Sequence, residues 1–317
     1  MMRKIRLVEV RSELAAGTRG ASLGIDAMKV ASLSKHSDFF LRFQPIRVKN
    51  ENELLFQEPK FKNAKYGEGV YTVLKRVCDA VSDLRSEGLF PIVLAGDHST
   101  AAGTIAGIKK ADPDKRLGAI WIDAHADFHS PYTTPSGNMH GMPLAMATAI
   151  DNIECEQNDI EEETEALWER IKSIGMRGPK MKPEDVVFIG VRDTESPEDY
   201  LMEKYGIKNF TTAEVTEKGI QQVSKEALEI LKDCDQIYIS FDVDSLDTSV
   251  SMGTGTPVPE GLSKEQALEL NIELIKDKRV CCWEIVEVNP TLDTENRMAN
   301  NAFEILEATT ASLIQNF

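Results

Sequence analysis

The sequence predicts an α/β fold in which helices cover both faces of a central, mostly parallel sheet. Short apolar runs rich in β-branched residues alternate with longer amphipathic stretches along the chain, a pattern typical of such three-layer α/β/α folds. In addition, acidic and imidazole side chains directly follow several of the apolar runs. No linker rich in proline, glycine or serine and no internal repeat interrupts the pattern, so we expect a single domain over residues 1–317.

The apolar runs are short and β-branched, which is typical of strands buried on both faces. We predict strands at Ile5–Val10, Pro91–Ala95, Gly118–Ile122, Asp185–Val191, Gln236–Phe241 and Val280–Val288. Longer segments with apolar residues at helical spacing predict helices at Gly67–Glu87, Thr100–Ala111, Thr216–Lys232, Lys264–Asp277 and Glu295–Ile314. Ser263 followed by Gln266 has the form of a capping box at the start of one of these helices.

The charge of the chain limits its partners. The 52 acidic and 36 basic residues give a net charge of −16, which repels phosphate backbones and argues against a nucleic-acid partner. No apolar stretch approaches the ~20 residues of a membrane span, and the N-terminus carries no secretory signal, so we expect no membrane association and a cytoplasmic location. The acidic segment from Asp151 to Glu165 is expected to be a solvated loop or helix face, with a partner surface as the alternative.

Acidic and histidine side chains follow four of the predicted strands. Because ligands bind outside the carboxyl ends of the strands in doubly wound sheets, we expect these side chains to meet at one edge. The motifs, in chain order, are GDHS at 96–99, DAHAD at 123–127, DVD at 242–244 and Glu287.

The spacing within the motifs favours a metal site. Side chains two residues apart point to the same side of an extended backbone, as in Asp242 and Asp244. Several buried carboxylates cannot remain ionised together without cations, because each unpaired buried charge costs several kcal/mol. A single motif would also fit a turn or a structural histidine, but three motifs at three strand ends favour two dications. Carboxylate and imidazole ligands without a thiolate suit Mn²⁺ better than Zn²⁺, Fe²⁺ or Co²⁺. The predicted ligands are His98, Asp123, His125, Asp127, Asp242 and Asp244.

GDHS, DAHAD and SFDVD (240–244) resemble the three signature motifs of the ureohydrolases, a family that includes arginases, agmatinases, guanidinobutyrases and formimidoylglutamases. The resemblance extends from residues 17–20 to EVNP at 287–290. SGNMHG at 136–141, together with 253–257 and 283–290, is similar to the arginase branch. This resemblance implies an arginase/deacetylase-like fold, two Mn²⁺ ions per subunit, a small guanidino substrate and a homo-oligomer, either a trimer or a hexamer.

The resemblance also implies roles for individual residues. The sets His98, Asp123, Asp127, Asp242 and Asp123, His125, Asp242, Asp244 match the two ion sites of the family, in which two carboxylates bridge. In the family, a hydroxide that bridges the ions attacks the guanidinium carbon. Asp127 then matches the residue that passes a proton to the leaving amine, and His140 matches the proton shuttle. Glu287 and Thr256 match the carboxylate and the hydroxyl beside the guanidinium group.

Substrate specificity is the part of the resemblance with departures. His129 stands where arginases usually carry asparagine, and Glu195 stands where they carry aspartate. The resemblance implies hydrolysis of L-arginine to L-ornithine and urea, and another guanidino substrate of the guanidinobutyrate, agmatine or formimidoylglutamate type is the alternative. A non-catalytic relative is disfavoured, because all six metal ligands are present. The positions matched to substrate binding are His129, Ser136, Asn138, Glu195, Glu198, Thr256 and Glu287.

Overall fold

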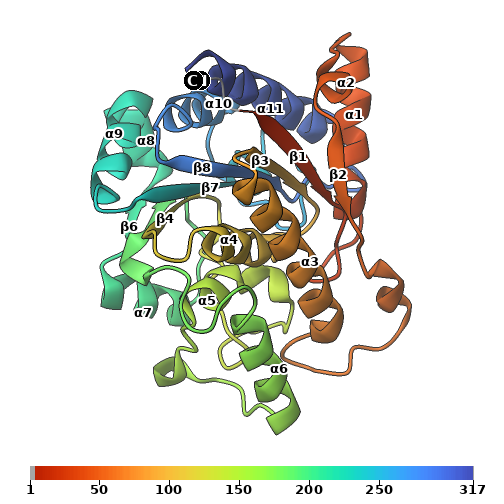
Figure 1. Cartoon of the computed structure of the whole chain (residues 1–317), viewed down its shortest axis with the longest axis vertical. Helices are drawn as coiled ribbons and strands as arrows, with labels where there is room; N and C mark the ends of the chain where they lie inside the picture. Colours follow the sequence, from red (N-terminus) through yellow and green to blue (C-terminus); the bar gives the residue numbers. More distant parts are fainter. Residues whose placement is uncertain (1–3, 317) are drawn as a thin grey trace.

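Eight parallel strands form the central sheet in residues 4–316, the part of the chain that this computed structural model describes (Figure 1). Their order across the sheet is β2-β1-β3-β8-β7-β4-β5-β6, and every pairing is parallel. The prediction of an α/β fold with a mostly parallel sheet is therefore confirmed. The strands are β1 (Ile5–Val10), β2 (Pro45–Val48), β3 (Phe90–Ala95), β4 (Leu117–Ile122), β5 (Val186–Ile189), β6 (Lys208–Phe210), β7 (Gln236–Asp242) and β8 (Val280–Val286).

Helices cover both faces of this sheet. Figure 1 shows α10 and α11 on one side, with α3, α4 and α5 on the other. The helices are α1 (Gly24–Ser34), α2 (Phe39–Arg42), α3 (Gly67–Ser86), α4 (Thr100–Ala111), α5 (Pro143–Thr148), α6 (Glu162–Lys172), α7 (Ser196–Tyr205), α8 (Thr212–Lys218), α9 (Ile220–Ile230), α10 (Lys264–Leu274) and α11 (Arg297–Gln315). None of the helices within residues 4–316 is both long enough and apolar enough to cross a membrane.

Alternate residues of the central strands face the two helical layers. Ile120 and Ile122 of β4 belong to the core shared with α1, α9, α10 and α11. Ala119 and Trp121 belong to the core shared with α3, α4, α5 and α6. Since both faces are buried, the central strands β3, β4, β7 and β8 are mostly apolar, which is why the sequence identified them.

The structure differs from the sequence prediction mainly at the periphery. The edge strands β2 and β6 were not predicted, because they are short and partly exposed and carry little apolar signal. The single helix predicted over Thr216–Lys232 is wrong, because Gly219, at φ +79°, separates α8 from α9. The capping box of Ser263 and Gln266 is confirmed at the start of α10.

The acidic segment lies on the surface and leads into α6. Its glutamates are exposed, as expected of a solvated segment. Asp151, by contrast, anchors the segment, because its Oδ1 accepts hydrogen bonds from Trp168 Nε1 and Lys172 Nζ, each at 2.6 Å. This contact fixes the start of the segment against α6.

Candidate active site

The predicted metal ligands lie at the carboxyl ends of neighbouring strands in the middle of the sheet. His98 follows β3, Asp123 follows β4, Asp242 ends β7 and Glu287 follows β8. These four strands are adjacent in the order β3-β8-β7-β4, so their ends meet at one place on the edge of the sheet. The strand order therefore explains why residues far apart in sequence converge.

Three carboxylates surround one nitrogen of His98. The Nδ1 atom lies 3.0 Å from Asp123 Oδ2, 2.9 Å from Asp127 Oδ2 and 3.1 Å from Asp242 Oδ2. The His98 side chain is 1% exposed, and neither its Nδ1 nor Asp123 Oδ2 makes a hydrogen bond within the described residues. Buried polar atoms left without such a bond are costly, so this group of atoms fits a bound cation.

A second cluster adjoins the first. His125 Nδ1 lies 3.0 Å from Asp244 Oδ2 and 3.6 Å from Asp123 Oδ1. Asp123 thus presents one oxygen to each cluster. Asp242 has its Oδ2 in the first cluster, while its Oδ1 accepts a hydrogen bond from the backbone N–H of Asp244. All six predicted ligands are therefore brought together.

The backbone that brings these ligands together is not extended. The prediction that side chains two residues apart point the same way because the backbone is extended is therefore wrong. β4 ends at Ile122, and Asp127 has a φ of +50°. Asp123 Oδ1 instead accepts a hydrogen bond from the backbone N–H two residues later, at 2.7 Å, and Asp242 Oδ1 does the same at 2.8 Å. Both motifs are tight turns closed by their first aspartate, and these turns aim the side chains at the same point.

Burial dominates the electrostatics of the carboxylates. It raises the pKa of Asp242 well above its ordinary value and that of Asp244 to about 6, and the neighbouring carboxylates add to both shifts. Burial also opposes ionisation of Asp123, but the nearby His125 and His98 imidazoles favour the ionised form and outweigh burial, so the pKa of that carboxyl is lowered. A cluster that resists ionisation in this way is one that dications would stabilise.

A cavity of about 220 Å³ opens onto these ligands. Its small size and polar lining fit a small, charged molecule. All the residues matched to substrate binding or to the proton shuttle line it, namely His129, Ser136, Asn138, His140, Glu195, Glu198, Thr256 and Glu287.

Glu287 and His140 lie together beside the clusters. His140 Nδ1 is 3.4 Å from Glu287 Oε1, the same oxygen that accepts a hydrogen bond from the backbone N–H of His98 at 2.9 Å. Burial lowers the pKa of His140, but the contact with Glu287 outweighs this effect and raises the pKa. Thr256 Oγ1 donates a hydrogen bond to Asp244 Oδ2 at 3.2 Å, so its hydroxyl supports a metal-ligand candidate.

The two unusual specificity residues contact each other. His129 Nε2 lies 2.8 Å from Glu195 Oε2, and His129 Nδ1 lies 3.1 Å from Thr133 Oγ1. Glu198 accepts hydrogen bonds from the backbone N–H groups of Phe128 and Glu195, and so completes the capping box of α7. The sequence suggested that His129, Glu195 and Glu198 contact the substrate separately. In the structure, these three residues form one hydrogen-bonded group.

Two neighbours of His98 had no role assigned from the sequence. The Trp121 ring stacks on the His98 ring, with centroids 4.3 Å apart and planes inclined by 10°. Ser240 Oγ lies 2.7 Å from His98 Nε2, on the side of the ring away from the carboxylates. Ser240 belongs to the SFDVD motif, so its position was visible in the sequence, but its contact was not.

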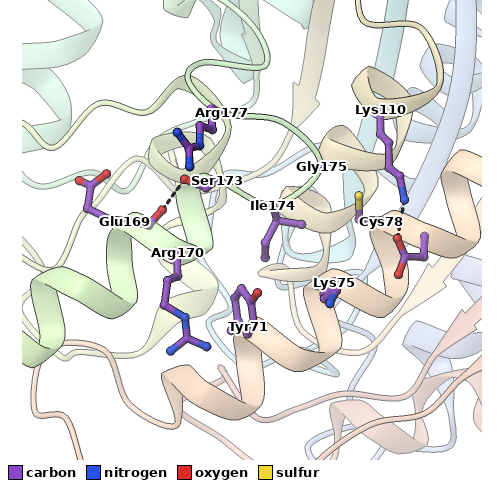
Figure 2. A pocket seen from close by; sticks show the side chains of 11 residues that line it. Tyr71, Lys75, Cys78, Lys110, Glu169, Arg170, Ser173, Ile174, Gly175 and Arg177 are labelled. Carbon is purple, nitrogen blue, oxygen red and sulfur yellow. Dashed lines mark hydrogen bonds and ion pairs between the residues drawn. The ribbon is translucent and has the colours of Figure 1, made fainter.

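A larger hollow, of about 580 Å³, lies elsewhere on the surface, between α3, α6 and the end of α4 (Figure 2). Two of its cations are already paired, since Lys110 contacts Asp79 and Arg170 contacts Glu68. None of the potential metal-binding groups found in residues 4–316 lies there. The smaller cavity, which combines convergent polar groups with buried ligands, is therefore the candidate active site.

A three-layer α/β/α fold with clustered carboxylates and imidazoles at the carboxyl edge of its sheet fits the class of metal-dependent enzymes. Comparison with known proteins narrows this class. The "Arginase family" profile matches residues 3–311. The chain belongs to the arginase family.

Individual relatives agree with this assignment. The chain is 34% identical to the arginase of Brevibacillus brevis over 314 residues, which cover 97% of this chain and 98% of the relative. The native structure of arginase from Bacillus caldovelox at pH 5.6 matches with a TM-score of 0.81 at 33% identity, covering 97% of this chain and 98% of the other. The Entamoeba histolytica arginase, solved in complex with L-ornithine, matches with a TM-score of 0.83 at 27% identity, covering 98% and 99%.

Proposed function

We propose that this chain hydrolyses L-arginine to L-ornithine and urea with two Mn²⁺ ions. The observation that carries the proposal is the pair of carboxylate–imidazole clusters that share Asp123 at the floor of a small polar cavity. The substrate follows from the relatives named arginase and from the L-ornithine bound by one of them.

The donor atoms fit manganese. Carboxylate oxygens and imidazole nitrogens are present, and no thiolate is among the clustered groups of the described residues. His98, Asp123, Asp127 and Asp242 would hold one ion, and Asp123, His125, Asp242 and Asp244 the other. When bound, two dications would lower the pKa of a shared water to generate a hydroxide and would stabilise charge that develops on the guanidinium group.

The remaining residues of the chain orient the substrate and move protons. The Glu287 carboxylate, held by the backbone of His98, would pair with the guanidinium group. Asp127 Oδ2 lies among the ligand atoms and would carry a proton to the leaving amine. His140, 3.4 Å from Glu287, lines the cavity and would exchange protons with solvent.

The outer part of the cavity would hold the amino-acid end of the substrate. Ser136 and Asn138 supply neutral donors for the α-carboxylate, and Glu195 supplies a charge for the α-ammonium group. His129 fixes one oxygen of Glu195 through their 2.8 Å contact. The same contact also favours the alternative substrate, a guanidino acid such as guanidinobutyrate. A substrate without an α-amino group would leave the contact between His129 and Glu195 undisturbed.

A urea-release assay separates these possibilities. Protein reconstituted with Mn²⁺ is tested in parallel with arginine, agmatine and guanidinobutyrate by urea release, and with formimidoylglutamate by formamide release. Arginine should exceed agmatine by at least ~100-fold in kcat/KM, because agmatine leaves the polar groups that face the carboxylate without partners. Equal turnover of agmatine or guanidinobutyrate would overturn the arginine assignment and leave the metal chemistry standing.

We also propose that the chain forms a homo-oligomer, a trimer or a hexamer. Light scattering coupled to size-exclusion chromatography measures the mass directly, and a monomeric mass would contradict the proposal.

A further inference from the structure

A carboxyl group is buried in the middle of the sheet, away from the cavity. Glu284 lies at the centre of β8 with 0% exposure, and it is not among the cavity-lining residues. Its strand neighbours Trp283 and Ile285 are core residues. An acidic side chain in such an environment is costly, so its presence calls for a partner or a role.

A continuous set of polar groups links Glu284 to His98. Tyr238 Oη donates a hydrogen bond to Glu284 Oε2 at 2.8 Å. Ser240 lies beside this pair, and its Oγ is 2.7 Å from His98 Nε2. The sheet register explains this arrangement: Ser240 of β7 pairs with Glu284 of β8, and Tyr238 is two residues before Ser240 on the same face.

The His98 imidazole decides which atom donates in each of these hydrogen bonds. His98 Nδ1 faces three carboxylates, so the imidazole can act as a metal ligand through Nδ1 only when Nε2 carries the proton. Ser240 Oγ then accepts from Nε2–H, and its own proton is free to turn towards Tyr238 Oη. Tyr238 in turn donates to Glu284. Ser240 therefore stands between the His98 imidazole and the Tyr238–Glu284 pair.

We propose that Tyr238 and Glu284 are positioning residues that hold His98, through Ser240, in the tautomer and orientation needed to bind a metal ion. This inference rests on the proposed function, because it requires that the clusters bind metal. Trp121, stacked on the ring, restricts its tilt, while the polar series fixes its rotation and its proton. A carboxyl at the end of such a series makes the imidazole a stronger ligand by polarising each hydrogen bond in turn.

The variant Tyr238→Phe tests this role, because it removes one hydroxyl and keeps the ring. Isothermal titration of Mn²⁺ into the metal-depleted full chain measures the affinity of each ion. We expect the affinity of one ion to fall about tenfold in Tyr238→Phe, with the other ion unaffected. Glu284→Gln, which keeps the size of the side chain but replaces its carboxyl with an amide, should weaken binding of the same ion.

A matched control separates positioning from simple loss of stability. Thr310→Val also removes a buried hydroxyl, one that donates to Leu306 O at 2.7 Å on α11, far from the site. This control should lower the melting temperature without changing either manganese affinity. With Zn²⁺ as a diamagnetic substitute, the Nε2–H proton resonance of His98 should be present in the wild type and should shift upfield in Tyr238→Phe as its hydrogen bond weakens.

The outcomes are distinguishable. Wild-type affinities together with an unshifted His98 resonance in Tyr238→Phe would overturn the inference and leave Tyr238 and Glu284 as a structural pair. Equal losses of affinity in Thr310→Val would also overturn it. If the wild-type chain binds no manganese at all, the proposed function fails first, and the inference fails with it.

Discussion

The variant Glu195→Ala tests how the chain holds the amino-acid end of its substrate. Glu195 is the acidic side chain placed to meet an α-ammonium group, and it is 55% exposed. A hydrogen bond to a charged group contributes about 1.5–3 kcal/mol when shielded, and an exposed ion pair contributes about 0.2–1 kcal/mol. For a half-exposed carboxylate we therefore expect a loss of about 1 kcal/mol, equivalent to a rise in KM for arginine of roughly fivefold.

The assay is steady-state urea release over a range of arginine concentrations. Because Glu195 lies at the far end of the substrate from the reacting carbon, the variant should raise KM while kcat changes little, the pattern of lost uniform binding. Glu203→Ala, an exposed acidic residue on the same helix α7, is the matched control and should leave both parameters unchanged. An unchanged KM in Glu195→Ala would refute the assigned role.

His129 extends the test to a double-mutant cycle. His129→Asn should be tolerated or improve the use of arginine, since it restores the residue usual in arginases and releases Glu195 from its 2.8 Å contact. Residues in direct contact couple, so the effects of His129→Asn and Glu195→Ala should not be additive. Additive effects would show that the contact has no influence on substrate binding.

Three further predictions concern metal, pH and backbone. Asp123→Asn should lose metal and activity together, because Asp123 belongs to both clusters, and metal analysis with urea release would contradict this if turnover persisted. The folded-state pKa values of Asp244 and Glu198 are raised, to about 6 and about 7. A carboxyl whose pKa is raised by folding stabilises the fold while it is protonated. This stabilisation is lost as the pH rises through the raised pKa. Calorimetry of the metal-free chain should therefore give a lower melting temperature at pH 8 than at pH 5, and Mn²⁺ should restore more stability at pH 8; the opposite order would contradict this sign. Gly137→Ala should cost at least ~1 kcal/mol in chemical denaturation, because φ is +75° and a Cβ would lie 1.9 Å from a backbone oxygen, whereas Gly88→Ala, at φ +73° in open space, should cost less.

The sequence predicted the centre of the fold better than its periphery. The strands β3, β4, β7 and β8 are buried along their whole length; β3 and β4 are continuous apolar runs, and β7 and β8 are mostly apolar around Ser240 and Glu284. The edge strand β6 has only three residues and is partly exposed, which leaves no comparable pattern. The division between α8 and α9 depends on the conformation of Gly219, and a glycine within an amphipathic stretch does not by itself show that the helix ends there.

The residues of the candidate site could be found from motifs, but their contacts could not. The six ligand candidates follow strand ends, and strand ends meet at one edge in any parallel sheet, so their convergence was predictable. The tight turns that aim them depend on hydrogen bonds from side chain to backbone. The contact between His129 and Glu195 joins residues 66 positions apart through the loop before α7, and no local pattern signals it.

A titration of Mn²⁺ into the metal-depleted chain, followed by urea release from L-arginine, tests the binuclear mechanism most directly. Two clusters that share Asp123 predict that activity reaches its maximum at two ions per chain, with metal analysis of the active protein giving the same ratio. Full activity at one ion per chain, or urea release in the absence of metal, would contradict a binuclear site.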